Sequence, residues 1–197
     1  MNLAALVIGR SVAQPFDETL HERLLEPLGM RSSGTTAPVE GMASGYAPPG
    51  RVLPSDERPF AGVGALIGDR HMRMYHDAAA MAPAFGIYST ARDMGRLAQF
   101  FIEDESDDIL SASMRSLMHE RHSGNRGLGL SLATINGRPV VRDDGWFAAH
   151  RAHLLHGDKA GIAVVVLANG DNASPRNIAE SFFRTAIGML EDPPDGT

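Results

Sequence analysis

Residues 162–167 read Ile-Ala-Val-Val-Val-Leu and are apolar at every position. A strand with one face in water alternates apolar and polar residues, so an unbroken apolar strand is covered on both faces. We therefore expect this segment in the middle of a layered sheet with helices packed against it.

Turn and capping residues place further elements around this strand. Asn136-Gly137 is typical of a two-residue hairpin turn between strands expected over 127–135 and 138–142. A third strand is expected over 146–156. Two helices are expected within the first thirty residues. Three more are expected to start at Ser89, at Ser111 and at Ser174-Pro175. This order predicts an α+β fold, with helices packed on an antiparallel sheet.

Apolar spacing predicts which helix faces are buried. Asp17 is expected to be the N-cap of the second helix, and Thr90 to Asp93 resembles a capping box. Met114, Leu117 and Met118 are expected to turn inward. Two larger sets each share one helix face: Leu3, Leu6 and Val7 in the first helix, and the predicted buried stripe Ile178, Phe182, Ala186 and Met189 in the last.

The chain is expected to form a single domain over 1–197, with a loop-rich excursion over 31–84 and a disordered tail over 191–197. Its formal charge of −6 argues against a nucleic-acid partner, and the absence of cysteine excludes disulfides. No apolar run approaches the ~20 residues of a membrane span. No basic residue precedes the first apolar run, so no export signal is predicted and the chain as given is expected in the cytoplasm.

Two patterns suggest ligands but have simpler explanations. His150, His153 and His156 recur every third residue, yet side chains on a strand alternate faces, so His153 would point away from the other two. We expect structural or solvated histidines and no metal site. Gly62-Val63-Gly64 has the wrong spacing to Gly68 for a dinucleotide loop, so no cofactor is expected.

A catalytic nucleophile is not found in the printed residues. There is no Gly-x-Ser-x-Gly, and Lys159, the only lysine, is preceded three residues earlier by His156 instead of serine. Ser123-Gly124-Asn125 imitates a Ser-x-Asn motif, but it lies in a polar turn and we interpret it as coincidence. No catalytic residue is therefore assigned.

Several segments, in order, resemble the family of serine β-lactamases, D-alanyl-D-alanine peptidases and penicillin-binding-protein-like esterases. The resemblance covers nearly the whole chain, but only the C-terminal portion of a family domain. The segments that carry it are Gln14-Pro15-Phe16, Pro27-Leu28-Gly29-Met30, Ser44-Gly45-Tyr46, Ile87 to Met94, and Val164 to Gly170.

The resemblance implies a β-lactamase/transpeptidase-like fold and acyl transfer from an amide or ester to a serine. It further implies a Lys/His-Ser/Thr-Gly motif at Asp143, Asp144 and Gly145, with the N–H of Trp146 in the oxyanion hole. Asp143 departs from this pattern, because it would repel the substrate carboxylate that the usual residue attracts. Ala149 stands where glycine is usual, and Phe85 interrupts a usual Ala-Gly-Gly.

The Ser-x-x-Lys and Tyr-x-Asn motifs of the family have no counterpart in the printed sequence. The first hypothesis is therefore a truncated, inactive C-terminal portion without the nucleophile helix, which meets a small amide or ester substrate only if an N-terminal part is supplied. The last strand would then expose an apolar edge, which favours self-association or poor stability. The alternatives are a non-catalytic binding or partner module of the same fold, and an unrelated α+β binding domain.

Overall fold

The larger sheet is organised around the turn at Asn136-Gly137. The computed structural model describes residues 2–36, 41–47, 61–62, 66–67, 71–76, 82–103, 108–147 and 149–191. Strands β5 (Ser131–Ile135) and β6 (Arg138–Phe147) pair antiparallel, with Ile135 opposite Arg138. Asn136 and Gly137 have φ of 48° and 73°, the positive values that this turn type requires. The predicted hairpin is confirmed, although β5 is shorter and β6 longer than expected.

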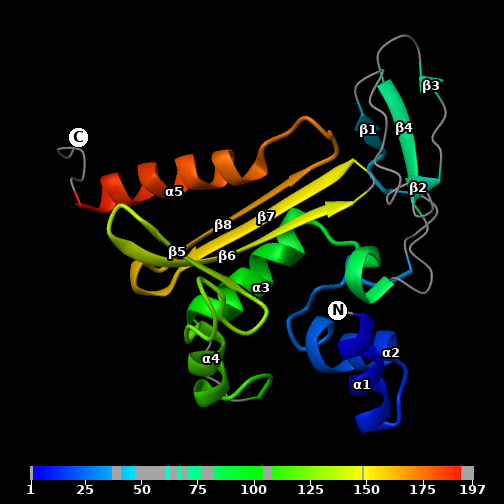
Figure 1. Ribbon diagram of the computed structural model, residues 1–197, viewed down its shortest axis with the longest axis horizontal. Coiled ribbons are helices and arrows are strands. Elements are labelled where there is room, and N and C mark those ends of the chain that lie inside the picture. Colours follow the sequence, from blue (N-terminus) through cyan, green and yellow to red (C-terminus); the bar gives the residue numbers. More distant parts are fainter. Residues whose placement is uncertain are drawn as a thin grey trace. The chain divides into compact units, whose positions relative to one another are not determined.

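Two more strands complete this sheet in the order β5-β6-β7-β8 (Figure 1). Strand β7 spans His150–Gly157, and a 3-10 turn at Asp158–Ala160 connects it to β8, which spans Ile162–Ala168. Within the described residues β8 is the last strand in the order, not a central one, and its residues are half-buried or exposed. An edge position is what the resemblance predicted for this strand.

The described residues form five α-helices and two short π-helical turns at His21–Leu25 and Ala82–Gly86. Helix α2 begins at Phe16 after Pro15, so Asp17 lies in its first turn and is not the N-cap that was predicted. The predicted helix start at Ser111 is confirmed: Ser111 is the N-cap of α4, and its side chain accepts a hydrogen bond from the Met114 amide. The helices are α1 (Asn2–Val12), α2 (Phe16–Leu20), α3 (Ala91–Glu103), α4 (Ala112–His119) and α5 (Pro175–Glu191).

The chain forms two compact units, which are described separately. The first comprises residues 1–93, 145–151 and 167–173, and the second comprises residues 94–144, 152–166 and 174–197. The predicted tail beyond Glu191 lies outside the described residues, as does most of the predicted excursion between 48 and 81.

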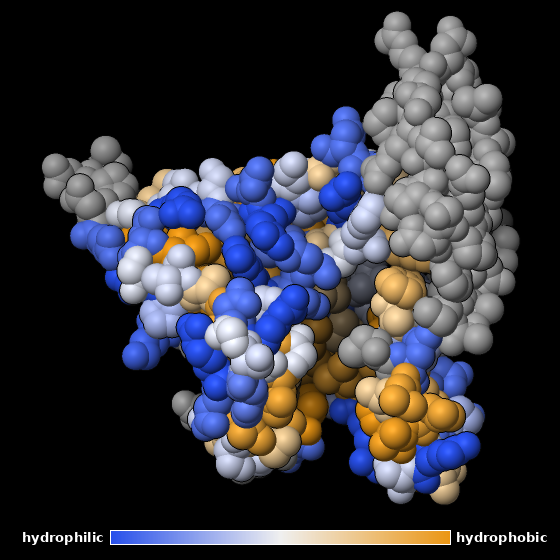
Figure 2. Space-filling view, viewed as in Figure 1, coloured by the Kyte–Doolittle hydropathy of each residue, from blue (hydrophilic) through white to orange (hydrophobic). Residues whose placement is uncertain are grey.

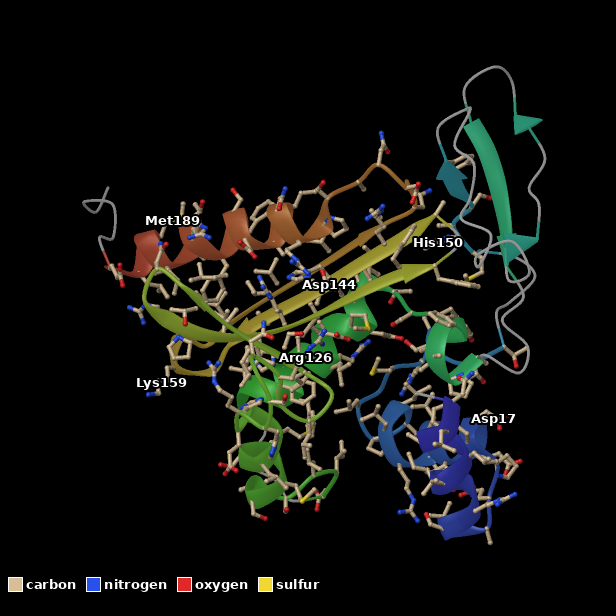
Figure 3. All side chains as sticks on the ribbon, viewed as in Figure 1. Asp17, Arg126, Asp144, His150, Lys159 and Met189 are labelled. Carbon is tan, nitrogen blue, oxygen red and sulfur yellow. The ribbon has the colours of Figure 1, made fainter. Side chains whose placement is uncertain are left out.

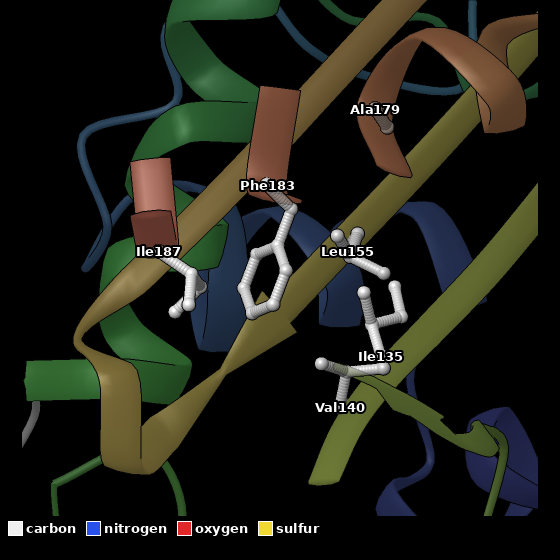
Figure 4. Close-up of a cluster of buried hydrophobic side chains, with 6 residues drawn as sticks. All are labelled: Ile135, Val140, Leu155, Ala179, Phe183 and Ile187. Atoms are coloured by element: carbon white, nitrogen blue, oxygen red, sulfur yellow. The ribbon is translucent and has the colours of Figure 1, made fainter. Parts of the chain in front are cut away.

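The core of the second unit lies between the sheet and α5 (Figure 4). Leu155 of β7 and Phe183 of α5 are both fully buried. Gly157 permits this packing, because a Cβ there would lie 2.9 Å from the Phe183 ring. On the other face of β7, His156 stacks against Phe101 of α3 at 5.3 Å between ring centroids. Successive β7 residues therefore contact different helices, so this part of the sheet is a middle layer. The core cluster comprises Ile135, Val140, Leu155, Ala179, Phe183 and Ile187.

The buried face of α5 differs from the predicted one. Ile178, Phe182 and Met189 are 43%, 64% and 61% exposed, and Ala186 is half-buried. The residues that pack on the sheet are the adjacent set Ala179, Phe183 and Ile187. Both sets are apolar with helical spacing, so periodicity alone could not choose between them.

Other predicted faces are also exposed. Leu3, Leu6 and Val7 of α1 are more than half exposed and contribute to an apolar patch over this helix (Figure 2). Met114 of α4 is exposed too, although Leu117 and Met118 are half-buried. None of the helices in the described part of the chain is long and apolar enough to cross a membrane.

The first unit contains a small second sheet that was not predicted. Strand β4 (His71–His76) pairs with β1 (Gly45–Ala47), β2 (Ala61–Gly62) and β3 (Leu66–Ile67).

Asp93 joins two distant segments of the first unit. Its backbone N–H donates to the Thr90 hydroxyl at 3.2 Å, which confirms this half of the predicted capping box. Its buried carboxylate accepts hydrogen bonds from the Ser32 amide at 2.7 Å and the Ser33 hydroxyl at 2.9 Å. The start of α3 is therefore tied to the end of the N-terminal helical region.

Candidate functional site

Asp143, Asp144, Gly145 and Trp146 are consecutive residues near the end of β6. Pairing of β6 with β5 ends where Ser131 lies opposite Arg142. Beyond that point, β6 continues from Asp143 to Phe147 with no residue of β5 opposite. The four predicted residues therefore lie in the part of β6 that extends beyond the end of β5. The first two belong to the second unit and the last two to the first, so their contacts are given separately.

Asp144 is part of a charged cluster in the second unit (Figure 3). One carboxylate oxygen lies 2.8 Å from Nδ1 of His153, and Arg176 of α5 contacts both carboxylate oxygens. His153 is 1% exposed, and its Nε2 is buried without a hydrogen-bond partner among the described residues. Because Nδ1 faces a carboxylate, we place the ring proton on Nδ1.

The two neighbouring carboxyl groups have pKa values shifted in opposite directions. Desolvation raises the pKa of Asp143, and the nearby charge of Asp144 adds to this shift. At Asp144 desolvation also acts to raise the pKa, but hydrogen bonds from Arg176 and His153 outweigh it and lower the pKa. The hydrogen bond between Arg176 and Asp144 also raises the pKa of Arg176. At neutral pH the charge of Asp144 is compensated by a cation in direct contact, whereas Asp143 interacts with the cation of Arg126 without a hydrogen bond.

Trp146 lies in a separate cluster in the first unit. Its indole Nε1–H donates to Oδ1 of Asp171 at 3.0 Å. The guanidinium carbon of Arg151 lies 5.0 Å from the centroid of the Trp146 ring system. Arg151 also donates to the same Asp171 oxygen at 3.3 Å. The next residue, Phe147, stacks on Phe85 with ring centroids 5.2 Å apart.

The three histidines of β7 are not brought together. His150 contacts the Ala43 carbonyl at 2.8 Å, His153 contacts Asp144, and His156 stacks against Phe101. Each contact ties β7 to a different segment, which agrees with the structural interpretation of these residues. Within the described ranges, no group of three potential ligands could hold a metal ion.

Other predicted features have structural explanations. Ala149 has φ of 65°, a conformation that glycine adopts at lower cost, which accounts for the glycine expected there. Asn125 lies in the turn before β5, where its carbonyl accepts a hydrogen bond from the Leu132 amide at 2.8 Å. Gly62 pairs with Tyr75, and Val63 and Gly64 lie outside the described residues.

The sequence analysis missed Arg151, Asp171 and Arg176 as neighbours of the predicted residues. Asp171 directly follows the Asn169-Gly170 pair on which the resemblance depends, so its position was an available signal. Arg151 and Arg176 carried no comparable signal, since their partners are 20 and 32 residues away in the chain.

Comparison with a protein-family model described as Beta-lactamase gives a match over residues 1–186. No curated protein sequence matches the chain.

Solved structures show the same fold. An octameric penicillin-binding protein homologue from Pyrococcus abyssi is 20% identical with a TM-score of 0.73, and covers 94% of this chain and 41% of its own. A D-amino acid amidase from Ochrobactrum anthropi SV3, complexed with L-phenylalanine amide, is 21% identical with a TM-score of 0.73, over 96% of this chain and 57% of its own. A D-stereospecific amidohydrolase from Streptomyces sp. is 19% identical with a TM-score of 0.68, over 91% of this chain and 51% of its own. The chain therefore spans about half the length of these proteins.

Proposed function

This chain belongs to the beta-lactamase family, and from that membership we propose that it supplies the substrate-binding strand of a serine hydrolase acting on an amide or ester. The observation that carries the proposal is that β6 continues from Asp143 to Phe147 past the end of its pairing with β5, at the residues where the resemblance places the substrate-binding motif. An extended substrate can lie along the edge of a strand, and a backbone N–H at Trp146 can donate to a developing oxyanion. Two of the similar structures are named as amidases or amidohydrolases, which supports an amide as the substrate.

The nucleophile of this reaction must come from residues outside the printed sequence. That sequence contains neither Ser-x-x-Lys nor Tyr-x-Asn, and its one lysine lies in the turn between β7 and β8. We propose that the chain alone is inactive. Removing nucleophile and base together leaves only binding and oxyanion assistance.

The proposal is tested first on the DNA upstream of the Met1 codon, read in the same frame. We expect Ser-x-x-Lys followed by Tyr-x-Asn, and we expect a fluorophosphonate to label that serine in the longer protein but no serine of the printed chain. An in-frame stop codon directly upstream would contradict the hydrolase role, and labelling of a serine within 1–197 would contradict the inactivity.

In the longer protein, Trp146→Pro removes the proposed oxyanion donor and Trp146→Phe keeps it. We expect Trp146→Pro to lower kcat about 100-fold to 1,000-fold relative to Trp146→Phe, as for removal of one oxyanion donor. Far-UV circular dichroism checks that both variants fold. Equal rates for the two variants would place the donor elsewhere.

A non-catalytic binding module is the second candidate. It is favoured by Asp143, an exposed carboxylate where the resemblance requires a cation. A stable complex of this chain with a separately encoded partner, formed without covalent labelling, would support this candidate over the first.

We also propose that the chain alone self-associates through β8, which is the last strand of its sheet among the described residues, and through the exposed apolar face of α5. An unpaired apolar strand edge favours pairing with another chain, and Ile178, Phe182 and Met189 leave a large apolar area in water. The Pyrococcus abyssi homologue is named as octameric, which supports association within the family.

A further inference from the structure

The indole of Trp146 contacts two charged groups of the first unit that also contact each other. Asp171 Oδ1 accepts from the indole N–H at 3.0 Å and from Arg151 at 3.3 Å. The Arg151 guanidinium lies 5.0 Å from the ring centroid, within the range of a cation–π contact. The three side chains therefore form a closed triangle in which each restrains the other two.

Asp171 is the fixed member of this triangle. Its side chain is 3% exposed, and its backbone N–H donates to the Tyr46 carbonyl at 2.9 Å. The Tyr46 amide in turn donates to the Asn169 carbonyl at 2.8 Å. Because backbone hydrogen bonds on both sides of Gly170 hold this turn, the carboxylate has a defined position against which other groups can align.

Trp146 is the member that needs alignment. It is 43% exposed, so packing alone leaves its two side-chain torsions free to change. A hydrogen bond at Nε1, at the far side of the ring system from Cβ, restricts both torsions together. Arg151 lies over the ring and also forms an ion pair with the buried carboxylate, so it restrains both partners of the hydrogen bond.

We propose that Asp171 is a positioning residue which, together with Arg151, holds Trp146 in one rotamer and thereby fixes the direction of the Trp146 backbone N–H. The inference rests on the proposed function, because it assigns that N–H to the substrate oxyanion. Donors stabilise an oxyanion only when they are aligned before the charge develops. Allowed rotamers depend on backbone torsions, so a side chain held at its far end also restricts the backbone.

The first test uses the printed chain and needs no catalysis. Trp146 is the only tryptophan, so fluorescence emission and acrylamide quenching report on this side chain alone. We expect Asp171→Ala to shift the emission to longer wavelength and to increase quenching. We expect Asp171→Asn, which keeps an Oδ1 acceptor but loses the ion pair, to lie nearer the wild type. Arg151→Lys keeps the charge but loses the planar group over the ring, and should fall between the two.

Folding is checked separately, since Asp171 is buried. If Asp171→Ala fails to fold by far-UV circular dichroism, the comparison of Asp171→Asn with Arg151→Lys decides. Emission and quenching identical to the wild type in folded variants of both residues would overturn the proposal. If Asp171→Asn restored the Trp146 emission and quenching that Asp171→Ala changes, the result would support a hydrogen bond to the indole and not a general packing effect.

The second test separates this inference from the proposed function. In the longer protein, we expect Asp171→Ala to lower kcat about 10-fold to 100-fold with little change in KM, as for a misaligned catalytic group, and Asp171→Asn to restore part of that loss. A changed emission spectrum with unchanged kcat would remove Trp146 from the reaction and overturn the assignment to the oxyanion. No activity in any form of the longer protein would contradict the proposed function, while the fluorescence comparison would still decide whether Asp171 holds Trp146.

Discussion

At the residue scale, the environment shifts the pKa values of two chemically identical neighbours in opposite directions. Asp143 and Asp144 are adjacent in the sequence, but the pKa of the first is raised and that of the second is lowered. The difference arises because His153 and Arg176 reach only Asp144 with hydrogen bonds. Neither partner could be identified from the sequence, since both meet Asp144 through strand pairing and helix packing.

Replacing each aspartate by asparagine should change stability with opposite signs. A carboxyl with a lowered pKa in the folded state stabilises the fold above the usual value near 3.8, and this contribution is lost as the pH falls through the folded value. A carboxyl with a raised pKa opposes folding above its folded value and has no effect well below 3.8. At pH 7 we therefore expect Asp144→Asn to destabilise and Asp143→Asn to stabilise, each by about 0.5 kcal/mol or less because both groups are solvent-exposed.

Urea unfolding at pH 7 and at pH 3 measures both effects. The stabilisation by Asp143→Asn should vanish at pH 3, while part of the Asp144→Asn loss should remain. The same sign for both variants at pH 7 would contradict the described environments.

At the element scale, α5 shows what periodicity predicts and what it leaves open. The start at Ser174-Pro175 and the amphipathic character of the helix were predicted and are confirmed. Its orientation was wrong, because the apolar residues cover two adjacent faces and only contact with the sheet selects one. The hairpin was easier, since Asn136-Gly137 encodes its turn through local backbone preference.

Two adjacent phenylalanines test this orientation. Phe183→Ala should lower the free energy of unfolding by about 3–5 kcal/mol, because it leaves a cavity under the sheet. Phe182→Ala, at 64% exposure, should change it by less than about 0.5 kcal/mol in dilute protein. Urea unfolding measures both, and Phe183→Leu replaces the alanine variant if that variant is unfolded. If Phe182→Ala lowered the free energy of unfolding more than Phe183→Ala, the face predicted from periodicity would be the buried one.

At the scale of the whole molecule, the α+β class and the beta-lactamase family followed from ordered short segments. The small sheet around β4 did not, because β1, β2 and β3 have only two or three residues each, too few to show a period. The order β5-β6-β7-β8 leaves β8 at an edge, and α5 adds apolar area in water.

Self-association should therefore depend on the exposed face of α5. We expect Phe182→Glu to shift the chain toward monomer in sedimentation velocity, because it places a charge in the apolar contact. Thr185→Glu adds the same charge at another exposed position of α5 and serves as the control. A wild-type chain that is monomeric at all concentrations would exclude the association, and an equal shift in both variants would point to net charge as its cause.

The turn between β7 and β8 offers one lysine for chemical coupling. Lys159 is exposed in this turn and is the one lysine of the printed sequence, so an amine-reactive reagent meets a single lysine side chain (Figure 3). His153, the partner of Asp144, lies four residues before the end of β7, or roughly 13 Å from this turn at strand rise. Surface coupling through Lys159 would therefore attach the molecule by this turn, at a distance from the Asp144–His153 contact.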